Sequence, residues 1–170
     1  MKKINDIFIL IIGILLFLFA YSLDQSVNLF FKNAKFAFLD VILSIITNFG
    51  FVVTVMLIIP SYILYKKNKN SVYLLWLAFI ASFALNFIIK LIVQRQRPID
   101  TFSYPFINII NYSFPSTHAI VAFSVLPLIA KYLPKQKHFF IIFAFLVALS
   151  RMYFNLHFLS DVVFGALAGY

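Results

Sequence analysis

The chain has no cysteine, no glutamate and only four glycines among its 170 residues. The missing cysteines exclude a disulfide framework and thiolate-ligated zinc or iron–sulfur sites. Charged residues are also scarce, at 11%, against about 25% in ordinary soluble domains. Intrinsic disorder is excluded, because disordered segments are poor in apolar residues and 64% of this chain is hydrophobic. The composition predicts an integral membrane protein.

The positive charge of the chain is concentrated in short clusters between long apolar runs. The formal net charge is +9, from fourteen Lys and Arg against five acidic residues. The clusters comprise Lys2 and Lys3, then Lys66, Lys67 and Lys69, and then Lys131, Lys135 and Lys137. Lysines in short loops between spans mark the cytoplasmic side of a membrane protein. This pattern predicts an N-terminus on the inner side, and it argues against a nucleic-acid partner.

Six apolar runs divide the chain. They cover residues 7–23, 41–65, 72–89, 116–132, 139–149 with a continuation past Arg151, and 160–170. All but the last are near the roughly 20 residues that a helix needs to cross a bilayer, and in lipid a helix satisfies its own backbone. We expect an all-α integral membrane bundle of six transmembrane helices, forming a single membrane-embedded domain over residues 1–170. The last helix is short, or truncated from a longer natural chain.

The first run also resembles a signal peptide, with a cleavage-like stretch at residues 20–22. Asp6 and the length of the run favour a retained span. With both termini inside, the outer side receives residues 24–40, 94–115 and 155–161. Residues 25–39 are moderately apolar and predict a helix that lies at the outer interface.

Two smaller features predict contacts between helices. Asn86, inside the third run, is expected to make a helix–helix hydrogen bond. Gly165 and Gly169 form a pair of small residues at helical spacing, which permits close packing against a neighbouring helix.

Seven ionisable residues lie at the outer ends of runs three to six. They are Lys90, Arg95, Arg97, His118, Arg151, His157 and Asp161. Ionisable side chains within a membrane are costly and are functional candidates by default. Because all seven gather on one membrane face, the sequence predicts a functional site there.

The spacing of these residues indicates an anion site. Lys90 and Arg97 are seven apart, so they share one helical face if the third helix continues that far. With Arg151 they supply three cations, which suit a tetrahedral dianion such as phosphate. His157 and Asp161 are four apart and can touch on a helix. A carboxylate on one imidazole nitrogen leaves the other nitrogen free to act as nucleophile or base.

The fourth run begins with Ser116, Thr117 and His118, directly after Pro115. A serine or threonine at a helix start caps the helix, and the free N–H groups of its first turn bind anions. This segment is therefore predicted to complete a phosphate cradle.

These residues form three motifs in order: Lys90-x6-Arg97-Pro98, Pro115-Ser116-Thr117-His118 and Ser150-Arg151-x5-His157-x3-Asp161. The set resembles the three-part signature of the type 2 phosphatidic acid phosphatase superfamily, also called lipid phosphate phosphatases. The order and the internal spacings match from Lys90 to Asp161. The long apolar runs are similar to the membrane branch of this superfamily.

The resemblance implies a role for each matched residue. His157 would attack phosphorus and become a phosphohistidine, with Asp161 orienting it. His118 would protonate the leaving oxygen and then help to activate water. The groups that would bind the phosphate oxygens are Lys90, Arg97, Arg151, Ser116 and Thr117. The reaction would need no metal and no cofactor.

Three residues depart from this pattern. The position of Thr117 is usually Gly in the family, and Gly allows close backbone approach. Arg95 lies outside the signature and is expected to face lipid headgroups. Asp100 is an acid in the outer loop with no assigned role.

The resemblance implies hydrolysis of a terminal phosphate or diphosphate of a membrane lipid. The candidate substrates are phosphatidylglycerol phosphate, phosphatidic acid, polyprenyl diphosphate and lipid A phosphates. The site would face the periplasm or exterior of a prokaryotic inner membrane. Three alternatives use the same residues: a phosphotransferase that passes phosphate from His157 to another acceptor, a transporter with a buried ionisable network, and an inactive binder of lipid phosphates.

Replacing Thr117 by Gly tests the departure in the second motif. We expect Thr117→Gly to keep or raise phosphate release from lipid phosphates, because Gly restores the backbone freedom that is usual at this position. The comparison is made between the purified variant and the unchanged protein. A collapse of activity would show instead that the Thr117 hydroxyl has been recruited into the site.

Overall fold

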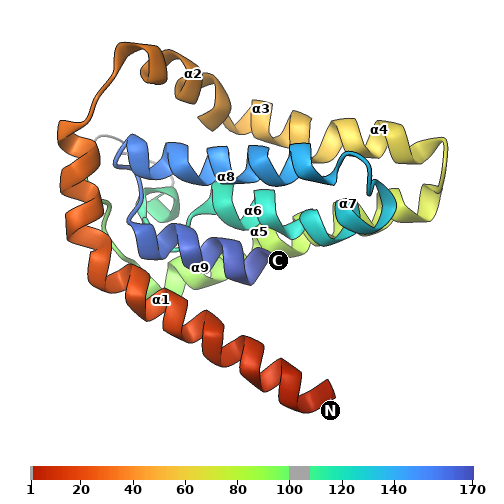
Figure 1. The fold of residues 1–170 in the computed structure, drawn as a ribbon, viewed down its shortest axis with the longest axis horizontal. Coiled ribbons are helices and arrows are strands. Elements are labelled where there is room, and N and C mark those ends of the chain that lie inside the picture. The colour runs from red at the N-terminus through yellow and green to blue at the C-terminus, as the bar shows by residue number, and fades with distance from the viewer. Residues whose placement is uncertain (1, 100–107) are drawn as a thin grey trace.

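The computed structural model describes residues 2–99 and 108–170 of the chain. Every regular element in these ranges is a helix (Figure 1). In chain order they are α1 (Lys2–Asn33), α2 (Ala37–Thr47), α3 (Phe49–Val53), the π-helical turn η1 (Thr54–Ile58), α4 (Ile59–Tyr65), α5 (Lys69–Val93), the 3-10 turn η2 (Asn108–Asn111), α6 (Thr117–Ser124), α7 (Leu126–Tyr132), α8 (Lys137–Tyr153) and α9 (Leu159–Gly169). The all-α expectation is confirmed. Asp100 lies outside the described residues.

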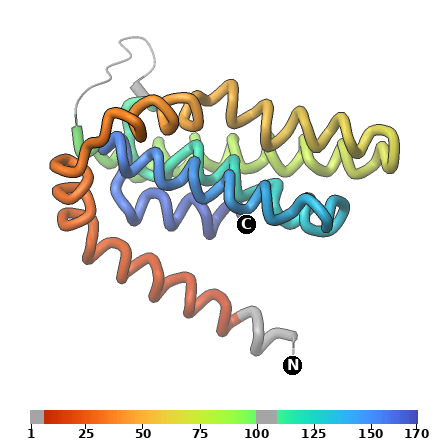
Figure 2. The backbone as a smooth tube through the Cα atoms, turned by 45° about the horizontal axis from the view of Figure 1, so that its top comes forward, coloured from red at the N-terminus to blue at the C-terminus, as the bar shows by residue number. Residues whose placement is uncertain are grey.

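The long helix α1 leaves the bundle at its N-terminal end, as Figures 1 and 2 show. Its first described side chains, among them Ile7 and Phe8, are exposed. Further along, α1 packs against α9 and α8. The helix continues to Asn33 and is interrupted only at residues 34–36 before α2 begins. The prediction of a separate interfacial helix over residues 25–39 is therefore wrong in its boundaries.

The second apolar run folds into helices that bend by 60° between α2 and α3. Asn48 makes the break: its backbone is extended, with ψ 122°, and its side chain accepts a hydrogen bond from the Phe51 N–H at 3.1 Å. The asparagine thus ends one helix and caps the next. As a result Thr47 is the last residue of α2, at the point where the chain changes direction.

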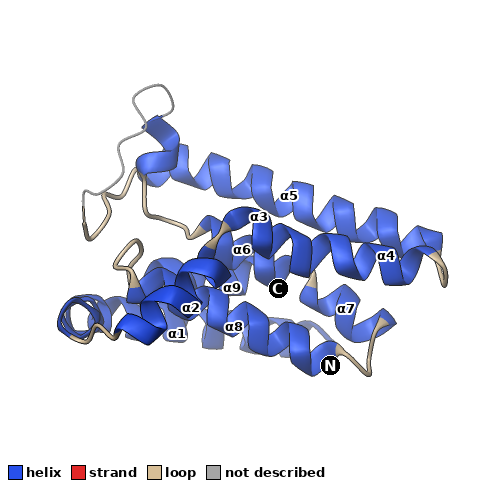
Figure 3. Ribbon diagram, turned by 90° about the horizontal axis from the view of Figure 1, so that it is seen from above, coloured by secondary structure: helices blue, strands red, loops and turns tan. Residues whose placement is uncertain are grey.

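The helix α5 spans the length of the bundle beside α4 (Figure 3). The Asn68 side chain caps its start by accepting from the Asn70 N–H at 3.1 Å. It ends because Gln94 has a left-handed backbone, with φ 49°. Arg95 and Arg97 therefore follow the helix, in a segment free to turn back over the bundle.

The centre of the bundle is α6, whose residues from Ala119 to Ser124 are all buried. Its most extensive contact is with α9. A Cβ atom at Gly165 would lie 3.0 Å from the Ser116 carbonyl oxygen, and one at Gly169 would lie 2.3 Å from the Ile120 carbonyl oxygen. This confirms the close packing predicted for the two glycines.

All six predicted apolar runs are helical in the described residues, but a count of six spans is not confirmed. Ile7–Asn33 within α1, and α5, are long and apolar enough to cross a membrane. The bent pair of α2 with Phe49–Tyr65 makes a third if it is one span. The apolar helices Thr117–Tyr132 and Leu159–Gly169 are shorter than these candidate spans.

The α6–α9 contact predicts the effect of adding two methyl groups. We expect the double variant Gly165→Ala/Gly169→Ala to lower the free energy of unfolding by about 1–3 kcal/mol, since both methyl groups meet the backbone of α6. Thermal unfolding in detergent measures the change. The matched control is Gly13→Ala, whose Cβ would meet only Leu167 Cδ1 at 3.8 Å. Equal stability of the double variant and the control would contradict the tight contact.

Candidate active site

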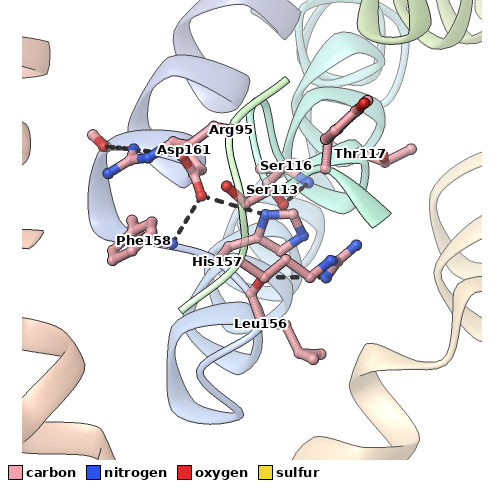
Figure 4. A network of polar contacts seen from close by, with 12 residues as sticks. Arg95, Ser113, Ser116, Thr117, Leu156, His157, Phe158 and Asp161 are labelled. Atoms are coloured by element: carbon pink, nitrogen blue, oxygen red, sulfur yellow. Dashed lines mark hydrogen bonds and ion pairs between the residues drawn. The ribbon is translucent and has the colours of Figure 1, made fainter. Parts of the chain in front are cut away.

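A cavity of about 520 Å³ opens where the bend after α2 faces α5, α6 and the loop between α8 and α9. Its lining includes six of the eight residues predicted for the site: Lys90, Arg97, Thr117, His118, Arg151 and His157. The other two, Ser116 and Asp161, lie directly behind this lining (Figure 4). The fold therefore brings all eight together, although they come from three separate stretches of the chain, residues 90–97, 116–118 and 151–161.

His157 and Asp161 are paired across the start of α9. The helix α8 ends at Tyr153, and Asn155, with φ 52°, turns the chain so that α9 begins at Leu159. Asp161 Oδ2 accepts a hydrogen bond from the Phe158 N–H at 2.9 Å and lies 3.7 Å from His157 Nδ1. The sequence predicted that the two residues touch as neighbours on one helix. Instead, His157 lies before α9, and the cap at the start of α9 brings Asp161 to it.

The electrostatic surroundings of His157 favour a neutral ring. The side chain lies in the loop between α8 and α9 and is buried. Burial lowers the pKa of His157 well below its usual value, and the positive charges of Arg151, Arg97 and Lys90 lower it further. An imidazole that stays unprotonated near neutral pH keeps a lone pair available for attack.

Lys90 and Arg97 reach the cavity in different ways. Lys90 is buried in the last turns of α5, and its Nζ donates to the Tyr112 carbonyl. Arg97 lies beyond the end of α5 at Val93, so the condition for a shared helical face with Lys90 is not met. Its guanidinium donates to backbone carbonyls at 2.9–3.1 Å, those of Ile110, Asn111 and Leu156.

Arg151 is buried in α8 and donates from Nη1 to the Thr47 hydroxyl. The backbone carbonyl of Thr47 also hydrogen-bonds the His118 ring. Thr47 can serve both because α2 ends there. Sequence reasoning missed Thr47, and the nearest signal was Asn48, a polar capping residue in the middle of an apolar run.

The start of α6 carries the second motif as predicted. Ser116 is the N-cap and accepts from the Ala119 N–H at 3.5 Å, while its own N–H donates to the Asp161 carbonyl at 3.1 Å. The His118 ring packs edge-on against Phe49, with centroids 5.1 Å apart. Its Nε2 atom has no hydrogen-bond partner within the described part of the chain.

Thr117 is held by Asn86 from the neighbouring helix. Asn86 Nδ2 donates to Thr117 Oγ1 at 2.9 Å, joining α5 to α6. This confirms the helix–helix hydrogen bond predicted for Asn86. The threonine side chain that replaces the usual glycine therefore has a partner, and it also lines the cavity.

The prediction that Arg95 faces lipid headgroups is wrong. Arg95 forms ion pairs with Asp161 and with Asp24 of α1, both at 2.7 Å, and Nη1 also donates to the Ser160 hydroxyl at 2.7 Å. Asp24 had been assigned to the outer loop without a role. The rule that singles out ionisable residues at the ends of apolar runs would have flagged Asp24 too, because it directly follows the first run.

Comparison with known proteins gives the family. A family model for the PAP2 superfamily matches residues 71–170. The chain belongs to the PAP2 superfamily. The match includes all three motifs of the predicted signature, so the resemblance seen in the sequence is confirmed.

This PAP2 chain has similar proteins in two species of Bacillus. It is 28% identical over 162 residues to phosphatidylglycerophosphatase B of Bacillus subtilis (strain 168), covering 87% of this chain and 78% of that protein. It is 32% identical over 108 residues to the bacitracin transport permease protein BcrC of Bacillus licheniformis, covering 61% and 52%.

The fold of this PAP2 chain matches that of a solved membrane protein. The crystal structure of a transmembrane PAP2-type phosphatidylglycerolphosphate phosphatase from Bacillus subtilis aligns with a TM-score of 0.71 at 22% identity. The alignment covers 96% of this chain and 89% of that one. The match shows that the two chains share a fold. The membrane character of this chain is supported by its own helices, since Ile7–Asn33 of α1 and all of α5 are long and apolar enough to cross a bilayer.

The cavity in this PAP2 chain is lined by apolar as well as charged side chains. The apolar lining residues are Phe49, Phe83, Phe87, Ile110 and Leu156. Phe49 belongs to α3, and Phe83 and Phe87 belong to α5. The rings of Phe49 and Phe83 lie 6.1 Å apart, and those of Phe83 and Phe87 lie 4.9 Å apart. One pocket thus combines a cationic site with an aromatic wall.

The hydrogen bond from Arg151 to the Thr47 hydroxyl predicts that Thr47→Val destabilises the protein more than Thr47→Ser does. We expect Thr47→Val to lower the free energy of unfolding by about 1.5–3 kcal/mol, because it leaves a buried guanidinium N–H without its acceptor. Thr47→Ser keeps the hydroxyl and should retain most of the stability. Thermal unfolding in detergent compares the two. Equal losses would mean that packing, rather than the hydrogen bond, makes Thr47 important.

Proposed function

We propose that this PAP2 chain is an integral membrane lipid phosphatase that hydrolyses a terminal phosphate or diphosphate of a membrane lipid and releases inorganic phosphate. The observation that supports it best is the cavity itself. Its lining combines three cationic side chains, aromatic residues, and His157, which is paired with the buried Asp161. A lipid phosphate has the same two parts, a dianionic head and an apolar tail.

In the first step His157 is the nucleophile. Its Nε2 lone pair bonds to phosphorus as the bond from phosphorus to the leaving oxygen breaks. Asp161, facing Nδ1, stabilises the positive charge that develops on the ring. His118, whose Nε2 has no hydrogen-bond partner in the described residues, enters this step as the imidazolium, which the negative charge of the bound phosphate stabilises. Its Nε2 proton passes to the leaving oxygen, which leaves the His118 ring neutral. The products of this step are the dephosphorylated lipid and a phosphohistidine.

In the second step water replaces His157 on phosphorus. His118, now neutral, accepts a proton from the attacking water, and the bond between phosphorus and Nε2 breaks to release inorganic phosphate. Lys90, Arg97 and Arg151 bind the phosphoryl oxygens in both steps. Their positive charge takes the place that a metal ion holds in other phosphoryl-transfer sites, so we propose a reaction without metal or cofactor.

The position of the site relative to the lysine clusters supports an outward-facing orientation. Figure 1 places the α4–α5 and α7–α8 connections at one end of the bundle and the α8–α9 loop at the other. Two of the lysine clusters belong to those connections. Under the positive-inside rule, we propose that the cavity opens at the periplasmic or outer face of a prokaryotic inner membrane. The lysines at the N-terminus lie outside the described side chains.

The choice of lipid is supported by the named relatives. The similarity to phosphatidylglycerophosphatase B over 87% of this chain makes phosphatidylglycerol phosphate the first substrate to test. Phosphatidic acid, polyprenyl diphosphate and lipid A phosphates carry the same terminal group and belong in the same panel. We propose that residues 1–170 act as one membrane-embedded phosphatase domain.

Phosphate release by the detergent-purified protein in EDTA tests the proposal. We expect the unchanged protein to release phosphate from one or more lipids of the panel, with a ranking that identifies the preferred headgroup. His157→Ala should reduce turnover by more than about a thousandfold, since no other group can replace the nucleophile. Retained activity in this variant would remove the phosphohistidine mechanism.

The matched control for this experiment is His138→Ala. His138 lies at the start of α8, at the lysine-rich end of the bundle and away from the cavity, so its loss should leave turnover unchanged. Phosphate release without any added acceptor counts against a phosphotransferase. Failure of the folded protein to release phosphate from any lipid would favour a transporter or an inactive binder.

A further inference from the structure

Asp24 and Arg95 have no step in the chemistry proposed above, yet they surround the carboxylate of Asp161. Arg95 lies between the two acids, with Nη2 2.7 Å from Asp24 Oδ2 and Nη1 2.7 Å from Asp161 Oδ1. Asp24 is 4% exposed and Asp161 is 0% exposed. Three charged groups from α1, from the segment after α5 and from α9 are thus joined in one chain, in which both carboxylates are buried and Arg95 is half-buried. Figure 4 shows Arg95 beside Asp161.

Arg95 fixes the rotation of the Asp161 carboxylate. Oδ1 is bound by Arg95, so Oδ2 is the oxygen that remains for the Phe158 N–H and for His157. Without the arginine, the carboxylate would lose its charged partner, and the Phe158 N–H on Oδ2 would hold the rotation with less support. A charged partner on one oxygen therefore sets which oxygen His157 faces, and at what angle.

Asp24 in turn fixes Arg95 and the start of α9. Its two oxygens accept from the Ser160 N–H at 2.8 Å and from the Ser160 hydroxyl at 2.6 Å, so α1 supplies an acidic cap to the first turn of α9. The Arg95 guanidinium also lies 4.0 Å from the centre of the Phe158 ring and 5.5 Å from that of Tyr21. The arginine is thus held on several sides.

We propose that Asp24 and Arg95 are positioning residues for the His157–Asp161 pair, which makes α1 part of the catalytic apparatus. The inference rests on the proposed phosphatase function. Two carboxylates and one guanidinium leave one negative charge in this network, and it faces the histidine. That charge is where it can stabilise the imidazole ring as Nε2 bonds phosphorus and the ring becomes positive.

Steady-state kinetics of phosphate release test the positioning role. We expect Asp24→Asn and Arg95→Gln each to lower kcat about 10- to 100-fold with KM changed less than about twofold, because a displacement near 1 Å in a catalytic group costs about that much. In an Asp161→Asn background, the further change Arg95→Gln should lower kcat less than about twofold, because two residues that act through one carboxylate are not additive.

Asp40→Asn is the matched control. Asp40 is also an acid with a hydrogen bond from another helix, since it accepts from the Tyr153 hydroxyl at 2.7 Å. Within the described residues, Asp40 is not among the hydrogen-bond and ion-pair partners of Asp24, Arg95 and Asp161. The kcat of the Asp40→Asn variant should therefore equal that of the unchanged protein. A single variant leaves a charge unpaired and can fail to fold. The double variant Asp24→Asn/Arg95→Gln keeps the net charge of the network, so its kcat is measured in place of that of a single variant that does not fold.

Nitrogen NMR of histidine-labelled protein separates this inference from the proposed function. The chain has three histidines, and His157→Ala assigns the signal of interest. We expect one neutral tautomer of His157, with the proton on Nδ1, and a mixture in the double variant. A His157 signal that does not change, or an unchanged kcat in a folded variant, overturns the positioning role. Absence of phosphate release by the unchanged protein overturns the proposed function, and the NMR comparison still decides the inference.

Discussion

A buried carboxylate in an apolar helix bundle is tolerated only when opposite charge and hydrogen-bond donors surround it. Asp161 is such a group, and its partners come from most of the fold. The chain must end α8 near Asn155 so that the Phe158 N–H reaches Oδ2, and it must leave α5 at Gln94 so that Arg95 turns back to Oδ1. The close glycine contact between α9 and α6 then brings Ser116 beside the same residue.

The cationic side chains of the cavity, unlike Asp161, donate hydrogen bonds to neutral groups. Lys90 and Arg97 donate to backbone carbonyls, and Arg151 donates to a threonine hydroxyl. The neutral oxygens that accept from Lys90 and Arg151 leave the positive charge of these side chains available to a phosphate dianion. The negative charge is kept one layer behind, on Asp161, where it acts on His157. This separation of charge is what the proposed reaction requires.

The sequence predicted the members of the site better than their geometry. Three motifs named eight residues, and the fold brings all eight together. The shared helical face of Lys90 and Arg97 does not form, because the left-handed backbone at Gln94 ends α5 before Arg97. Arg95 was assigned to the membrane surface, because a lone arginine at a span end is usually there. Its two acidic partners are 71 and 66 residues away in the chain, and no local pattern connects them.

Composition and hydrophobic runs by themselves determined an all-helical membrane protein, since only helices satisfy the backbone within such runs in lipid. Motif spacing by itself predicted the family, since the matched residue types recur in a fixed order along the chain. The tertiary structure alone decided that Asp24 of α1 is linked through Arg95 to Asp161 and that Thr47 serves both Arg151 and His118. Such contacts depend on where helices break and how closely they cross. Those features arise from packing between segments that are far apart in the chain, so the order of residues does not reveal them.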